Sequence, residues 1–274
     1  MRAFSAVYGF VSAFRVQLPL AAFLLFLNMA SAMGGLKAAG IAAGAALAVM
    51  IQLAYLLDRR FSQREDAVNV PAVELRVSPA PPAFFAALLL ADSLYILLHT
   101  PFRPLLALSV VFVPLYAVPV DGVTLIKRVP ALKTLVNLAA FWGVGVLAPF
   151  LLHHAFSWTA AAALVRATWA LIPFILALSV ILDMRDYGGD AEAGVRSVPV
   201  LLGLKATAAA LALLLAPVLL RHLVLGERAD SAWTLWTMAA AAAAAFRPPR
   251  WFFELYLLSA NLMLLCGLAG RLAS

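Results

Sequence analysis

Three aspartates in the second half of the chain have a spacing that suits metal binding. Asp183, Asp186 and Asp190 are three and four residues apart, so a helix that continued through them would carry all three on one face. Like charges on one stripe repel each other, and Mg²⁺, which prefers carboxylate oxygens, would relieve that repulsion. On spacing alone, a solvated loop whose acids pair with Arg185 and Arg196 is an equal alternative.

A second acidic stretch comes earlier in the chain. Asp58, Ser62 and Asp66 recur every four residues and would share one helical face, with Arg59 beside them. Taken alone, such a run is typical of the end of a membrane helix. Two acidic helix ends that face each other across a bundle would hold Mg²⁺ ions that bind a diphosphate, while apolar helices take a hydrocarbon tail.

A basic stretch runs from Tyr116 to Lys133 and contains the pair Lys127 and Arg128. Arginine offers a two-pronged donor and lysine a point charge, and both suit diphosphate oxygens. The alternative is that this pair only sets membrane topology, which needs no more than its charge.

One acid lies in the middle of an apolar segment. Asp92 and Ser93 interrupt residues 82–99. Because a carboxylate at membrane depth costs a few kcal/mol, an intramembrane aspartate is a candidate functional residue. We expect Asp92 to line a pocket, where it orients an acceptor or takes a proton from it. The alternative is a hydrogen bond to a neighbouring helix.

Membrane-crossing helices must position these residues. Hydrophobic residues make up 65% of the 274 residues, charged residues make up 12%, and the mean hydropathy is +0.99. Soluble domains are usually about 45–50% apolar and about 25% charged, so the composition excludes them. The sequence predicts one all-α, polytopic membrane domain over residues 1–274. Its nine apolar segments are 16–33, 38–57, 82–99, 104–120, 132–151, 159–182, 206–225, 232–246 and 251–270. Gly40, Gly44 and the alanine run 239–245 are expected to let helices approach closely.

Basic residues indicate the orientation. Fourteen of the twenty lysines and arginines lie on the side that holds the N-terminus and the loops after segments two, four, six and eight. The positive-inside rule makes that side cytoplasmic, which fits a prokaryotic inner membrane. Since these residues lie mostly in short loops, they indicate topology and not a nucleic-acid partner. The acidic and basic stretches described above share this cytoplasmic side.

These residues resemble the UbiA superfamily of intramembrane prenyltransferases. The most specific resemblance is the stretch 183–190 with its tail, which is similar to the family's second aspartate motif and its continuation at Gly194, Ser197, Pro199 and Gly203. The stretch from Tyr116 to Lys127 and Arg128 resembles the family's Tyr/Lys segment, with a longer gap. Nine helices, the N-in topology and the order of the segments extend the resemblance over most of the chain.

The first aspartate motif departs from the family pattern. The family has Asn-Asp-x-x-Asp-x-x-x-Asp, and an alignment without gaps places Asp58 at the asparagine and Asp66 at the third aspartate. Arg59 and Ser62 stand where the family has its first two aspartates. Two of the three carboxylates of this motif are therefore missing.

The resemblance implies a reaction and its parts. Family members bind a prenyl diphosphate through Mg²⁺, ionise the allylic C–O bond and pass the carbocation to a lipophilic acceptor such as an aromatic ring or a lipid. It implies that Asp183, Asp186 and Asp190 hold one metal ion and that Asp58 and Asp66 hold the other. The implied diphosphate contacts are Lys127, Arg128, Arg59 and Arg185. Two alternatives stay open, namely a UbiA-type terpene cyclase and a non-catalytic, lipid-binding relative.

Overall fold

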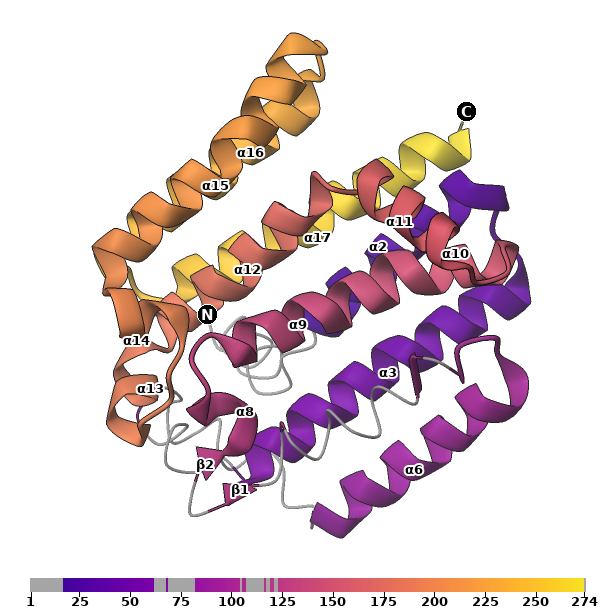
Figure 1. Cartoon of the computed structure of the whole chain (residues 1–274), viewed down its shortest axis with the longest axis horizontal. Coiled ribbons are helices and arrows are strands. Elements are labelled where there is room, and N and C mark those ends of the chain that lie inside the picture. The colour runs from indigo at the N-terminus through magenta and orange to yellow at the C-terminus, as the bar shows by residue number, and fades with distance from the viewer. Residues whose placement is uncertain are drawn as a thin grey trace, which may run out of the picture.

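Long apolar runs of the sequence fold into long helices. The computed structural model describes residues 17–61, 68, 82–103, 105–106, 116, 119–120 and 123–273. Figure 1 shows α9 between α3 on one side and α12 on the other, with α6 beyond α3 and the α15–α16 hairpin beyond α12. The longer helices are α2 (Gln17–Gly34), α3 (Ala38–Phe61), α6 (Pro82–His99), α9 (Leu132–Trp142), α12 (Leu171–Arg185), α15 (Leu204–Val224), α16 (Arg228–Ala244) and α17 (Arg250–Ala273).

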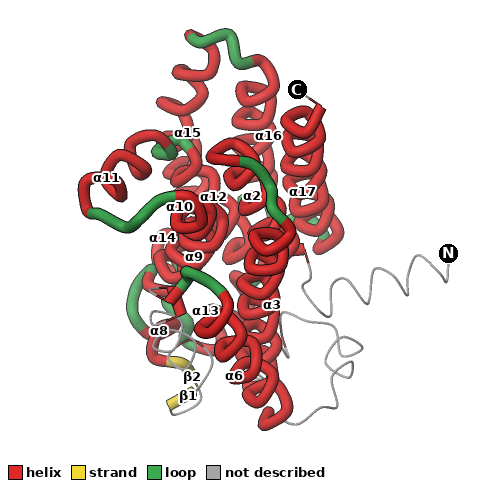
Figure 2. Tube along the Cα trace, turned by 90° about the vertical axis from the view of Figure 1, so that its right-hand side faces the viewer, coloured by secondary structure: helices red, strands yellow, loops and turns green. Residues whose placement is uncertain are grey.

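Short elements connect these helices. They are β1 (Pro119–Val120), β2 (Val123–Thr124), α8 (Leu125–Arg128), the π-helix η1 (Gly143–Leu147), α10 (Ala148–His153), α11 (Trp158–Ala167), α13 (Tyr187–Ala193) and α14 (Val198–Leu202). β1 and β2 pair antiparallel, with Pro119 opposite Thr124. In Figure 2, α8, α13, β1 and β2 gather at the opposite end of the molecule from the C-terminus. Because α8 and α13 are short and are joined directly to α9 and α12, the long helices determine where these elements lie.

The structure confirms the all-α, polytopic fold class. Eight of the nine predicted segments coincide with described helices, and most of the ninth, 104–120, lies outside the described residues. Five described spans are long and apolar enough to cross a membrane, or six if the bent pair α11 and α12 is one span. Large apolar side chains also remain on the outside, such as Leu213 at 77% exposure, which suits a lipid environment. The count of nine crossings stays a prediction.

One predicted segment is broken. The expected single helix 159–182 is two helices, α11 and α12, which meet at an angle of 71°. Pro173 lies near the start of α12, and a proline ring clashes with the carbonyl four residues earlier, within the break at 168–170. Oγ1 of Thr168 donates to the carbonyl of Leu164 at 2.8 Å and receives the indole N–H of Trp142 at 3.3 Å. These bonds stabilise the end of α11, so the uninterrupted helix was a wrong prediction.

Glycines let α2 lie close to two neighbours. A Cβ at Gly44 of α3 would lie 2.4 Å from the ring of Phe26, and a Cβ at Gly145 of η1 would lie 2.4 Å from Cδ2 of Leu25. Real Cβ atoms do not approach other atoms so closely, so larger residues here would push the helices apart. The expected packing role of Gly44 is confirmed. The alanine run also packs as expected, since three of its members are buried in one apolar cluster.

The turn between α15 and α16 contains an ion cluster that makes stability depend on pH. Nδ1 of His222 donates a hydrogen bond to Glu227, and Arg221 lies 3.2 Å from the same carboxylate oxygen. The hydrogen bond from His222, followed by the charge of Arg221, holds the pKa of Glu227 below its ordinary value of 4.5. A carboxyl whose pKa is lowered in the folded protein contributes stability above the ordinary value. That contribution is lost as the pH falls through the lowered pKa.

We therefore expect Glu227→Gln to lower the thermal unfolding midpoint of detergent-solubilised protein at neutral pH. The difference from wild type should shrink below pH 4.5, the ordinary pKa of the carboxyl. Melting curves of both proteins between about pH 3 and about pH 7 measure this directly. A constant difference across that range would contradict the pH assignment.

Candidate functional site

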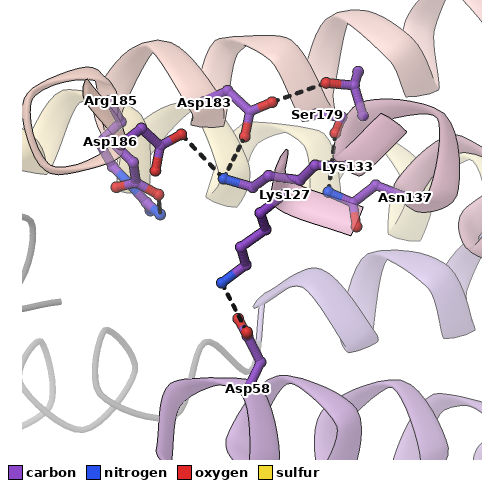
Figure 3. Close-up of polar contacts among 10 residues, drawn as sticks. Asp58, Lys127, Lys133, Asn137, Ser179, Asp183, Arg185 and Asp186 are labelled. Atoms are coloured by element: carbon purple, nitrogen blue, oxygen red, sulfur yellow. Dashed lines mark hydrogen bonds and ion pairs between the residues drawn. The ribbon is translucent and has the colours of Figure 1, made fainter. Parts of the chain in front are cut away.

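Polar side chains meet where α9 packs against α12. Nζ of Lys133, in the first turn of α9, lies 3.0 Å from Oδ1 of Asp183 and 3.2 Å from Oδ2 of Asp190. Figure 3 shows the ammonium between two carboxylates. Oγ1 of Thr134 donates to the other oxygen of Asp183 at 3.0 Å. Lys133, Asp183 and Asp190 are 9%, 3% and 1% exposed, so this is a buried ionic cluster.

The three aspartates of the stretch 183–190 do not lie on one continuous helix. α12 ends at Arg185 and α13 begins at Tyr187, with Asp186 at the joint between them at φ −90° and ψ 7°. The condition for one helical stripe, a helix that continues through all three residues, is therefore not met. The turn at Asp186 redirects the chain so that Asp190, on α13, comes back beside Asp183, on α12, and both contact the same lysine.

The backbone fastens the basic stretch to the loop after α13. Gly194 ends α13 at φ +75°, a left-handed conformation that favours glycine. Beyond it, the N–H of Arg196 donates to the carbonyl of Lys127 at 2.9 Å, and the N–H of Ala131 donates to the carbonyl of Arg196 at 3.1 Å. The segment between α8 and α9 is thus held beside the second aspartate motif by main-chain bonds.

A second buried ion pair joins α8 to α3. Nζ of Lys127 lies 2.8 Å from Oδ1 of Asp58 (Figure 3), and these residues are 2% and 6% exposed. The ammonium also lies 5.6 Å from the ring centre of Tyr116, within the range of a cation–π interaction. The pair joins the first acidic stretch to the basic stretch.

Arg185 is held by two carboxylates. Its guanidinium donates to both oxygens of Asp186, at 2.8 and 2.9 Å, and lies 3.5 Å from Glu254 of α17. A two-pronged bond of this kind fixes the plane of the guanidinium. Arg185, expected from the sequence as a diphosphate contact, is therefore bonded within the chain.

Two cavities adjoin the lysine–aspartate cluster. The larger has a volume of about 290 Å³ and is almost entirely apolar, and the smaller has about 40 Å³ and includes Lys133, Asp183 and Asp186 in its wall. Four residues line both cavities, namely Tyr55, Tyr116, Asn137 and Phe141. An apolar space thus opens beside a charged one, as a ligand with a hydrocarbon tail and a charged head requires.

Comparison with known proteins places the chain in a family. The model of the UbiA prenyltransferase family matches residues 20–261, which is most of the chain. The chain belongs to the UbiA prenyltransferase family. The apo structure of a UbiA homologue from Aeropyrum pernix K1 has the same fold, with a TM-score of 0.66, 16% sequence identity, and coverage of 94% of this chain and 98% of that one. No curated protein matches the sequence.

In this UbiA protein, some predicted residues come together and others do not. Asp183, Asp186, Asp190, Lys127 and Asp58 lie at one end of the bundle, on the elements described above. Arg128 follows at the end of α8 and is half-buried. Asp66 and the side chain of Arg59 lie outside the described residues.

Asp92 lies apart from this cluster. It is on α6, which packs against α3 at the edge of the bundle (Figure 1). Its Oδ2 is buried without a hydrogen-bond partner among the described residues. The described cavities next to Lys133 do not have Asp92 in their walls. The expected role of Asp92 in a pocket stays a prediction.

Sequence reasoning did not assign a site role to Lys133, Thr134 or Asn137 of this UbiA protein. Nδ2 of Asn137, one turn after Lys133, donates to Oγ of Ser179 on α12 at 3.2 Å. The available signal was a lysine inside the apolar segment 132–151, since a buried ammonium in a membrane helix needs a partner.

Proposed function

We propose that this protein transfers a prenyl group within the membrane from an allylic isoprenoid diphosphate to a lipophilic acceptor, either an aromatic molecule or a lipid. The junction of the two cavities is the observation that supports this most directly. The apolar cavity of about 290 Å³ is near the lower end of the about 300–1,000 Å³ that small-molecule sites occupy. It would take the hydrocarbon tail, and the charged end beside Lys133 would take the head.

Cations of the chain would bind the diphosphate. We propose Lys127 and Arg128 as direct contacts, with Arg59 as a third, because an arginine holds two phosphate oxygens at once and a lysine one. Asp183, Asp186 and Asp190 would position Lys133 and Arg185, to which they are bonded. The carboxylates would thus act on the substrate through the basic side chains that they hold.

Departure of the diphosphate is the demanding step. The allylic C–O bond breaks and its electron pair leaves with the diphosphate, while an electron pair of the acceptor forms the new bond to the allylic carbon. The acceptor then loses a proton. Fixed positive charges beside the leaving oxygens stabilise the charge that develops on them, and such preorganised groups are worth about 10²–10³ in rate.

Divalent metal ions are generally used in the UbiA family, and Mg²⁺ is the ion that the aspartate motifs predict. When bound, such an ion would neutralise diphosphate charge. The described carboxylates do not fit the two predicted ions, because each one already pairs with a lysine or an arginine. Among the described residues, the group whose ligand atoms converge is instead His222, Glu227 and Asp230, at the far end of α15. The steps above therefore use only the cations of the chain.

The site would open to the cytoplasm. The protein is an integral membrane protein with several long apolar helices, and the excess of basic residues around the aspartate motifs supports a cytoplasmic site in a prokaryotic inner membrane. Membrane lipids would then surround the apolar cavity and deliver both lipophilic substrates from the bilayer.

Product analysis tests the proposal. Purified protein is incubated with allylic diphosphates of 10 to 20 carbons and a membrane lipid extract, with and without Mg²⁺, and products are identified by mass spectrometry. We expect a prenylated acceptor whose yield falls about 100-fold in Asp186→Asn, which removes the charged partner 2.8 Å from Arg185 and leaves Glu254 at 3.5 Å. The yield should be unchanged in Asp230→Asn, at the end of the α15–α16 hairpin away from Asp186. A hydrocarbon or terpene alcohol formed without acceptor would favour a cyclase. Recovery of intact diphosphate alone would favour a lipid-binding relative.

A further inference from the structure

The second aspartate motif of this protein already contains a cation. Lys133 places its ammonium 3.0 Å from Asp183 and 3.2 Å from Asp190, and all three residues are buried. Two buried carboxylates this close together require positive charge between them, because each is otherwise desolvated beside a like charge. A divalent ion is the usual solution for an acidic motif, and here a lysine of the chain occupies that place.

The position of this lysine is part of the fold. Lys133 is in the first turn of α9, and the preceding segment is fastened by the two main-chain bonds between Arg196 and residues Lys127 and Ala131. Thr134, the next residue, bonds the second oxygen of Asp183. Both oxygens of Asp183 are thus bonded to consecutive residues of α9, which orients the carboxylate toward the helix.

The first motif is arranged in the same way. Lys127 pairs with Asp58 at 2.8 Å, and both are buried. Arg59 and Ser62 stand at the positions where the family pattern has two of its aspartates. Each motif therefore contains a lysine partner, and the first also contains fewer carboxylates.

We propose that Lys133 replaces the divalent cation of the second aspartate motif, so that this protein binds a prenyl diphosphate without a metal ion at Asp183 and Asp190. This inference rests on the function proposed above for the choice of ligand. Its central prediction is a gain of function, since removal of the lysine would uncover two converging carboxylates, the ligands that Mg²⁺ and Mn²⁺ prefer. Lys133→Ser should therefore create a metal site that the wild type lacks.

Manganese binding tests the inference without any substrate. Wild type, Lys133→Ser and the matched control Lys205→Ser, an exposed lysine of α15, are titrated with Mn²⁺ in detergent, and free Mn²⁺ is measured by electron paramagnetic resonance. We expect Lys133→Ser to bind one more Mn²⁺ per chain than the other two, with an affinity at least about tenfold above theirs. Any ion held by His222, Glu227 and Asp230 would appear equally in all three. Equal binding by all three proteins would overturn the proposal.

Ligand binding provides a test on the wild type alone, which does not depend on folding of the variant. Binding of farnesyl thiodiphosphate, which resists ionisation, is measured by calorimetry in EDTA and in Mg²⁺. We expect the wild-type affinity to differ less than about tenfold between the two conditions, and that of Lys133→Ser to depend on Mg²⁺. Wild-type binding only in Mg²⁺ would overturn the proposal. If farnesyl thiodiphosphate binds in neither condition, the proposed function fails, whereas the manganese result still decides the role of Lys133.

Discussion

Asp183→Leu is expected to abolish prenyl transfer and to destabilise the protein by about 3 kcal/mol. Asp183 accepts bonds from both Lys133 and Thr134, and its removal leaves a buried ammonium with one carboxylate fewer. Breaking a buried pair costs about 3–5 kcal/mol. We expect the lower end of that range because Asp190 still lies 3.2 Å from the ammonium. Unfolding in increasing detergent denaturant and the product assay measure the two effects.

A triple variant separates stability from activity at this site. Asp183→Leu combined with Lys133→Met and Asp190→Asn removes all three charges of the lysine–aspartate cluster, so part of the lost stability should return. Prenyl transfer should stay absent, because the cation beside the head of the substrate is gone. If the single variant Asp183→Leu were as stable as wild type, the buried ion cluster would not have the energetic role assigned to it.

Gly143→Leu is expected to shorten the prenyl chain that the protein accepts. Gly143 begins η1 and lines the cavity of about 290 Å³. Its φ of −59° and ψ of −49° are ordinary helical values that leucine adopts without strain. A Cβ there would lie 3.4 Å from Cδ2 of Leu105, an ordinary contact. The rest of the side chain would therefore occupy the cavity itself.

The size of this effect follows from the apolar surface that is displaced. Excluding one five-carbon isoprene unit from the cavity costs at most about 4 kcal/mol at about 0.8 kcal/mol per carbon. The 20-carbon diphosphate should therefore lose up to about a thousandfold in kcat/KM, whereas the 10-carbon diphosphate should keep most of its activity. Gly270→Leu, at an open position near the end of α17, is the matched control. An unchanged preference for chain length in Gly143→Leu would show that the tail lies elsewhere.

Helix positions could be predicted because the preference of each residue for lipid depends on its own side chain. Nearly every residue of the run 206–225 is apolar, the exceptions being Thr207, Arg221 and His222. A run of about 20 predominantly apolar residues is long enough to cross the bilayer whatever its neighbours are. The structure places α15 at Leu204–Val224, within two residues of that prediction. The break in the segment 159–182 lies beside Pro173, which a rule based on apolar composition alone does not register. The break is also stabilised by the bond between Trp142 and Thr168, which are far apart in sequence.

The contacts of the charged residues could not be predicted from short stretches of the sequence. Spacing singled out Asp183, Asp186 and Asp190, and charge singled out Lys127 and Arg128. Spacing also suggested one helical stripe, whereas the chain turns at Asp186. It did not pair any of the aspartates with Lys133, which is fifty residues before Asp183 in the sequence.

The sequence by itself determined the membrane environment, most of the helix positions and the residues of the family motifs, since each depends on composition or on short spacings. Only the tertiary structure decided which cation lies between Asp183 and Asp190 and that Asp92 lies apart from them on α6. Ion pairing acts across space and requires two side chains to meet. That meeting depends on how α9 packs against α12 and on the main-chain bonds that hold the loops, and neither is encoded within a single segment.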